Sequence, residues 1–110
     1  MDLVHSHGVV PGKIDLRTLV DTCSTNAAKT FKMFPQKGAL AVGSDADVVL
    51  YDPAFTSAFT QKDSLSQVDY CGFEGMPRRG RAEQVFLRGQ RVAREGTFVG
   101  TPAAGRYLNR

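Results

Sequence analysis

The hydrophobic pattern of the chain changes its period near residue 35. Before that point the apolar side chains recur at i, i+3, i+4 and i+7, the stripe of an amphipathic helix: Leu16, Leu19, Val20 and Cys23. Asp15 stands where the N-cap of this helix is expected. The polar run that follows favours a break, after which Thr25 or Asn26 would cap a second helix over 27–32.

Beyond residue 35 the pattern is that of short strands and turns. We expect strands over 37–43, 48–51, 55–60, 83–87, 91–94 and 97–99. The run from Val48 to Tyr51 is apolar throughout, which is typical of a strand covered on both faces, and Asp52-Pro53 is expected to end it. The clearest hairpin turns at Arg88-Gly89-Gln90.

The length of the chain limits what it can form. Its 110 residues correspond to one small domain or a piece of a larger one, and a complete (β/α)8 barrel takes roughly 250 residues. Hydrophobic residues make up 42% of the sequence, which excludes a disordered chain. Two short helices followed by strands predict an α+β arrangement in which the helices have no opposite layer to pack on. Residues 1–35 therefore resemble the end of a larger unit.

Positive charge is concentrated in the last third of the chain. The net charge is +3, and residues 75–110 hold eight arginines against two acids, Glu83 and Glu95. A nucleic-acid partner would need a recognition helix or interleaved aromatic and basic residues, and the sequence has neither pattern. We therefore expect arginines that keep strand edges soluble, and no nucleic-acid partner.

Membrane and secretion signals are also missing from the sequence pattern. No apolar run approaches the roughly 18 residues of a membrane span, and the first residues do not form a secretory signal. Two cysteines, Cys23 and Cys71, are too few for a disulfide framework. These observations predict a cytoplasmic protein without a membrane partner.

The most conspicuous candidate for chemistry is His5-Ser6-His7. On a strand, two histidines at this spacing project from one face and bind one metal ion together. Zinc needs at least a third protein ligand, however, and neither cysteine nor any acid stands at ligand spacing. We expect two partly exposed histidines on a helical turn that Gly8 ends, and no metal site.

Other candidate motifs fail on their spacing. Asp45, Asp47 and Asp52 bracket a strand, and an apolar run interrupts what would be a calcium loop. No glycine-rich phosphate loop and no G-x-S-x-G nucleophile motif occur. Cys23 is expected to be an inert core thiol, and Cys71 lies in a loop without a base to activate it. The residues therefore predict no catalytic, cofactor-binding or metal-binding side chain in this chain.

A series of short motifs nevertheless resembles one enzyme family. The chain is similar to the C-terminal part of the amidohydrolase superfamily, and within it to dihydropyrimidinases and D-hydantoinases. The resemblance covers nearly the whole chain. It rests on S-T-N-A-A-K (24–29), K-G-x-L-A-V-G-S-D-A-D-V-V-L-x-D-P (37–53), D-Y with F-E-G-M (69–76), R-G-Q-R-V (88–92), G-x-F-V-G (96–100) and G-R-Y-L (105–108). Ala27 departs from the proline that bacterial members often carry.

The resemblance implies a fold and an activity for the parent enzyme. It implies a (β/α)8 barrel that holds two zinc ions bridged by a carboxylated lysine and hydrolyses hydantoins or dihydropyrimidines, beside a small β-sandwich. Residues 1–35 would be terminal barrel helices, and residues 36–110 the C-terminal part of the sandwich with its tail. The family's metal ligands and substrate loops lie earlier in such chains, so no position here inherits those roles.

Three functions remain open at this point. The first is a structural, non-catalytic portion of a cyclic amidohydrolase, with the rest of the barrel as its partner and a homo-oligomer, a tetramer in the family, as its assembly. The second is a free-standing β-rich binding module that places its arginine-rich hairpin on an acidic partner. The third is a small metalloprotein that uses His5 and His7.

Overall fold

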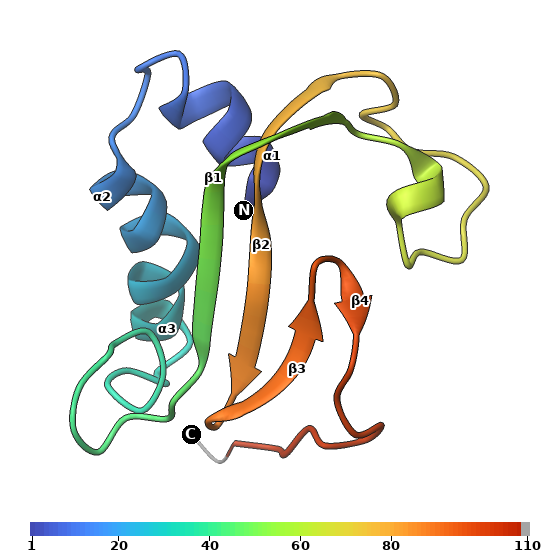
Figure 1. Cartoon of the computed structure of the whole chain (residues 1–110). Coiled ribbons are helices and arrows are strands. Elements are labelled where there is room, and N and C mark those ends of the chain that lie inside the picture. The colour runs from blue at the N-terminus through green and yellow to red at the C-terminus, as the bar shows by residue number, and fades with distance from the viewer. Residues whose placement is uncertain (109–110) are drawn as a thin grey trace.

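A helical half and an antiparallel sheet follow one another along the chain (Figure 1). The computed structural model describes residues 1–108. The helical segments are α1 (Asp2–Val4), η1 (His5–Val9), α2 (Leu16–Val20), η2 (Asp21–Thr25), α3 (Asn26–Thr30) and the single turn η3 (Gln61–Asp63). The strands are β1 (Val48–Ala58), β2 (Pro77–Leu87), β3 (Gln90–Arg94) and β4 (Thr97–Phe98). The α+β fold with a small antiparallel sheet that the sequence predicts is confirmed.

The second helical stretch begins where the sequence predicts and then continues further. The Asp15 carboxylate accepts a hydrogen bond of 2.7 Å from the Thr18 N–H, which confirms the N-cap. The predicted break is wrong, because α2, the wider turn η2 and α3 follow one another without a gap. Thr25 has a helical backbone, with φ −62° and ψ −50°. Its hydroxyl donates to the Gly38 carbonyl at 3.0 Å, so it bonds a distant loop instead of capping a helix.

The four strands form one antiparallel sheet in the order β1-β2-β3-β4. The predicted hairpin is confirmed, since Leu87 pairs with Gln90 across a turn whose two residues both have positive φ, Arg88 at 48° and Gly89 at 79°. β4 returns against β3 with Ala93 opposite Phe98.

Four of the expected strands are different in the structure. The strand expected over 83–87 begins earlier, because β2 starts at Pro77. Residues 37–43 form bends and turns and no strand. Asp52-Pro53 does not end β1, which runs on to Ala58 and includes the residues expected to form a separate strand. The register with β2 shifts between Asp52 and Thr56, and such an irregularity accommodates a proline that has no N–H for the ladder.

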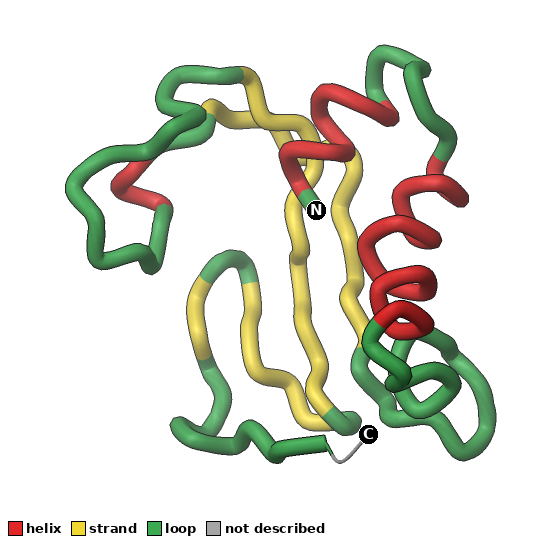
Figure 2. Tube along the Cα trace, turned by 180° about the vertical axis from the view of Figure 1, so that it is seen from behind, coloured by secondary structure: helices red, strands yellow, loops and turns green. Residues whose placement is uncertain are grey.

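The helices α2 and α3 lie beside the edge strand β1, whereas α1 and η1 contact β2, and the loop between β1 and β2 extends away from α2 and α3 (Figures 1 and 2). Within residues 1–108 the buried apolar side chains are Leu19 and Ala28, both on the helical half. The rest of the predicted stripe faces outward, with Leu16 59% exposed and Cys23 also exposed, so the expectation of a core thiol at Cys23 is wrong.

The sheet is also less covered than expected. Val49 is 41% and Leu50 45% exposed, so the residues of this chain do not cover β1 on both faces. The accessible surface is 8020 Å², whereas a compact protein of this mass exposes roughly 6,000 Å². The radius of gyration is 15.0 Å, against about 13 Å for a compact domain of this length. The chain therefore leaves much of its apolar surface without a covering layer.

Candidate functional site

A cluster of polar contacts joins η1 to β2. The Ser6 hydroxyl accepts the Arg79 N–H at 2.8 Å and lies 3.0 Å from the carbonyl oxygen of the same residue. His5 Nδ1 lies 2.7 Å from that carbonyl, and His7 Nε2 lies 3.0 Å from the Pro77 carbonyl. Because a carbonyl only accepts, these two ring nitrogens carry the protons.

Two members of this polar cluster, His5 and Ser6, are buried where the chain packs closely around Gly80. His5 and Ser6 are 6% and 8% exposed, and the His5 ring meets the edge of Tyr51 with ring centroids 5.0 Å apart. A Cβ on Gly80 would lie 2.6 Å from a Tyr51 ring carbon and 2.9 Å from His5 Nδ1. The φ of Gly80 is +81°, which also favours glycine. The expectation of a partly exposed His5 is therefore wrong, and the helix runs through Gly8 to Val9 instead of ending there.

Charged and aromatic side chains surround the same junction. Arg78 pairs with the Asp2 carboxylate at 2.5 Å. Burial, and after it the negative charge of Asp2, raises the pKa of Tyr51 far above its usual range, so this phenol stays neutral. The Arg81 guanidinium lies 4.1 Å from the centroid of the Phe55 ring, a cation–π contact on the neighbouring strand.

In the described part of the chain, the two histidines contact backbone groups and no other metal-ligating side chains. Within residues 1–108, no three His, Cys, Asp or Glu side chains come together in a way that could hold a metal ion. One nitrogen of each imidazole donates to a backbone carbonyl of β2. The described residues therefore do not fit a zinc site, and the absence of catalytic, cofactor-binding or metal-binding residues stays a prediction that assays must test.

A large apolar groove lies between the α2–α3 helix and β1. Its volume is about 790 Å³, and we call it the helix–β1 groove. It is lined largely by apolar side chains, among them Val20, Phe34, Leu40, Val48 and Val49, together with the exposed thiol of Cys23. Leu40 is 79% exposed. The groove offers a surface for an apolar segment of protein and no arrangement of nucleophile and base.

Ionic contacts form part of the lining of the helix–β1 groove. Lys37 pairs with Asp45 at 2.8 Å and with Asp47, whose other carboxylate oxygen accepts the Arg88 N–H at 2.8 Å. Burial opposes the charge on Asp47, but the Lys37 and Arg88 bonds outweigh it and lower the pKa of the Asp47 carboxyl. Asp52 accepts the Ala54 N–H at 2.9 Å. Asp45 and Asp47 therefore hold the irregular segment before β1, as the sequence predicts, whereas Asp52 lies inside the strand and shapes no turn.

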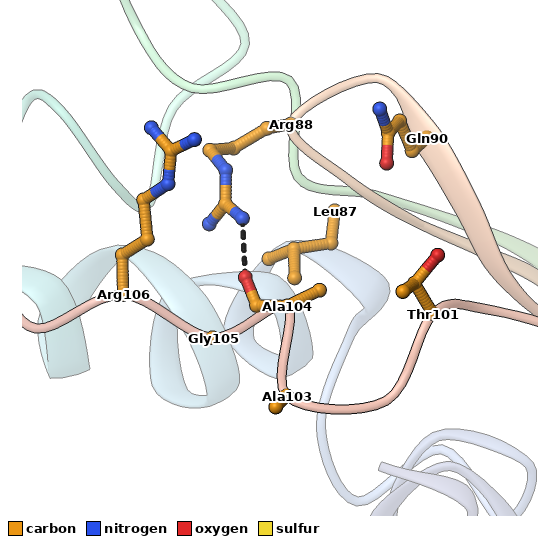
Figure 3. Close-up of a pocket in the computed structure, with 8 residues that line it drawn as sticks. All are labelled: Leu87, Arg88, Gln90, Thr101, Ala103, Ala104, Gly105 and Arg106. Atoms are coloured by element: carbon orange, nitrogen blue, oxygen red, sulfur yellow. Dashed lines mark hydrogen bonds between the residues drawn. The ribbon is translucent and has the colours of Figure 1, made fainter.

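A second hollow, of about 520 Å³, lies between the β2–β3 turn and the tail (Figure 3). Arg88 donates to the Ala104 carbonyl at 2.6 Å, and the guanidinium of Arg106 lies nearby in the figure. Among residues 1–108, those that line this hollow include no acid, which makes it chemically suited to a small anion.

Comparisons with known proteins identify the family. The model of the amidohydrolase family matches residues 3–92. The chain belongs to the amidohydrolase family. Over all 110 residues it is 42% identical to a D-hydantoinase of Geobacillus stearothermophilus and 39% identical to the dihydropyrimidinase of Rattus norvegicus, and it covers 23% and 21% of those proteins.

Solved structures of this family agree with the fold. The crystal structure of dihydropyrimidinase from Brevibacillus agri is 48% identical, with a TM-score of 0.95 over 99% of this chain and 24% of that one. The chain thus spans about a quarter of the length of the amidohydrolases it matches.

Within residues 1–108, no helix is long and apolar enough to cross a membrane.

Proposed function

We propose that the chain is the C-terminal structural portion of a zinc-dependent cyclic amidohydrolase of the hydantoinase or dihydropyrimidinase type. The observation that carries this proposal is that nearly the whole chain matches a segment of relatives with those names, and that this segment is about a quarter of their length. In this proposal residues 1–35 are terminal barrel helices and residues 36–110 are the C-terminal share of the β-sandwich. The proposed boundary falls in the irregular segment between α3 and β1.

The surface of the chain supports a partner of this kind. The helix–β1 groove and the outward side chains of Leu16 and Val20 present apolar area along one helix face. At about 25 cal/mol per Å² of apolar area, covering half of the roughly 2,000 Å² of surface beyond the compact value, of which somewhat more than half is apolar, would contribute on the order of 10 kcal/mol before entropy losses. The proposed occupant is the remaining barrel of the same enzyme, in a cytoplasmic homo-oligomer.

The same proposal predicts that the chain alone does not hydrolyse cyclic amides. In the parent enzyme, zinc would supply activated water and polarise the amide carbonyl. In this proposal the described residues of the chain pack against the barrel and orient it, and they supply no ligand to such an ion. Residues 1–108 therefore supply surface and support, while the reacting groups belong to the remainder of the enzyme.

A split-enzyme experiment tests this proposal. The matched segment is removed from the Geobacillus stearothermophilus D-hydantoinase, and the truncated enzyme is assayed on hydantoin with and without the 110-residue chain. We expect each part to be inactive and the mixture to recover zinc-dependent hydrolysis. The Val20→Asp chain, which places a charge in the groove, should recover much less, and the segment of the D-hydantoinase itself serves as positive control.

Two results would count against the proposal. Turnover by the isolated chain that zinc supports and EDTA abolishes would show a catalytic site of its own. Failure of the chain to restore activity, under conditions where the native segment restores it, would show that the groove does not receive the amidohydrolase barrel.

The hollow between Arg88 and Arg106 favours a second candidate function, a binding module for an acidic partner. Several arginines of the hairpin already have intramolecular contacts, such as Arg88 with Ala104 and Arg91 with Gln84. Arg106 lines the same hollow, where its guanidinium lies beside that of Arg88, and no acidic side chain is among the described residues that line the hollow. Titration with inorganic phosphate, followed by the Gly105 amide resonance, separates the two functions, because only the binding module predicts a saturable shift that Arg106→Gln removes.

A further inference from the structure

The edge of β2 is left open where β3 ends. β3 pairs with β2 from Gln84 to Leu87, whereas β1 accompanies β2 down to Pro77. Among the described residues, the stretch 77–81 therefore has β1 as its only strand neighbour. An unpaired strand edge presents a row of backbone N–H and C=O groups that need partners.

The side chains of η1 supply those partners. Ser6 accepts the Arg79 N–H, and the Arg79 carbonyl receives His5 Nδ1–H at 2.7 Å. One step further along the same edge, the Pro77 carbonyl receives His7 Nε2–H at 3.0 Å. Three consecutive side chains thus meet backbone groups of two alternate residues of β2, which is the spacing that a neighbouring strand would use.

We infer that His5-Ser6-His7 is a polar latch, a strand substitute that caps the open edge of β2 and fixes the position of the first helix on the sheet. The inference does not depend on the proposed function, because every bond lies between residues of the chain itself. It also gives the two histidines a role that needs no metal ion. Gly80 belongs to the latch, since its missing side chain lets His5 and Tyr51 approach the strand.

The latch requires each imidazole to donate from a particular nitrogen. Asparagine places an N–H near the position of Nδ1, and glutamine places one near the position of Nε2. The two histidines donate from different ring nitrogens, so His5 should tolerate replacement by asparagine and His7 replacement by glutamine. His5→Asn and His7→Gln keep the donor in place, whereas His5→Gln and His7→Asn displace it.

Amide hydrogen exchange of the 110-residue chain, followed by NMR, tests the latch at Arg79. We expect slow exchange of the Arg79 amide in the wild type and in the two variants that keep the donor. Exchange should be about tenfold faster in Ser6→Ala and several-fold faster in the two displaced variants, while the amides of 84–87 stay unchanged. The control is Ser44→Ala, which removes another hydroxyl–carbonyl bond, 2.8 Å to Pro35, in an exposed loop.

Each alternative outcome overturns the inference. If the Arg79 amide of the wild type exchanges at the rate of an unstructured peptide, the edge is open and no latch exists. If the Arg79 amide exchanges equally fast in His5→Asn and in His5→Gln, the imidazole acts by packing and not as a directed donor. If added zinc slows exchange in the wild type but not in His7→Ala, the histidines bind metal instead.

Discussion

The latch and the helix–β1 groove differ in how far the chain supplies its own contacts. At the latch, the hydrogen-bond donors of His5, Ser6 and His7 all find acceptors within the chain, and His5 and Ser6 are nearly fully buried. At the groove, apolar side chains such as Leu40 remain largely exposed. A backbone hydrogen bond needs a single partner at about 3 Å, whereas apolar burial needs a covering layer of many atoms. The chain can complete the first by itself but not the second.

The largest expected effect comes from closing the space at the latch. Gly80→Ala places a Cβ within 3 Å of Tyr51 and His5 at a positive φ, and we expect it to lower the free energy of unfolding by about 3 kcal/mol or more. Gly43→Ala is the matched control, because Gly43 also has positive φ, +92°, but open space around it. Gly43→Ala should lower the free energy of unfolding, measured in urea, by only about 1 kcal/mol. Equal losses would mean that the close packing at Gly80 contributes nothing.

Two leucines of α2 allow a buried and an exposed position of the same helix to be compared. Leu19 is 2% exposed and Leu16 59% exposed. Leu19→Ala should lower the free energy of unfolding by about 2–3 kcal/mol, and Leu16→Ala by less than about 1 kcal/mol. Urea unfolding followed by circular dichroism measures both. A larger loss at Leu16 would show that the helix packs by its other face in solution.

The exposed groove predicts association at high concentration. Leu40→Glu should reduce concentration-dependent association of the isolated chain, measured by light scattering, because it removes apolar area from an unpaired surface. The free energy of unfolding should change by no more than about 0.5 kcal/mol. A wild-type chain that stays monomeric at high concentration and binds no hydrophobic dye would contradict the description of this groove as uncovered.

An effect smaller than those at Gly80 and Leu19 is expected at the Lys37–Asp47 pair, as a pH dependence of stability. The pKa of Asp47 is lowered in the folded state, so its contribution to stability is present above the unfolded pKa near 3.8 and is lost as the pH falls through the folded value. Asp47→Asn should remove about 1 kcal/mol at pH 7, less than a fully buried pair because both side chains are partly exposed, and should flatten the acid side of the stability curve. Asp69→Asn, in the β1–β2 loop, should leave the curve unchanged.

Local signals in the sequence predict some elements correctly. The Asp15 cap depends on the Thr18 N–H three residues away, and the hairpin depends on two turn residues, Arg88 and Gly89. The motifs that resemble amidohydrolases also lie in continuous segments, so the amino-acid order alone is enough to indicate the family. The strand predicted over 37–43 is wrong because an alternation of apolar and small residues does not show whether a partner strand is available.

The candidate site could not be predicted, for a different reason. Ser6 and Arg79 are separated by 73 positions, and nothing in H-S-H indicates which backbone it will meet. The requirement for glycine at position 80 arises from Tyr51 and His5, which belong to two other elements. No periodicity or motif in the sequence predicts these contacts, because they form only when the fold brings three separate segments together.

The α+β character, the helix start at Asp15, the hairpin and the membership of the amidohydrolase family can all be read from the order of the amino acids. They follow from interactions between near neighbours and from continuous motifs. Packing in three dimensions is what carries β1 through Pro53, places the two histidines on a strand edge and turns Cys23 outward. Those outcomes depend on which groups a folded chain brings within about 3–4 Å of one another, and that proximity is a property of the whole fold.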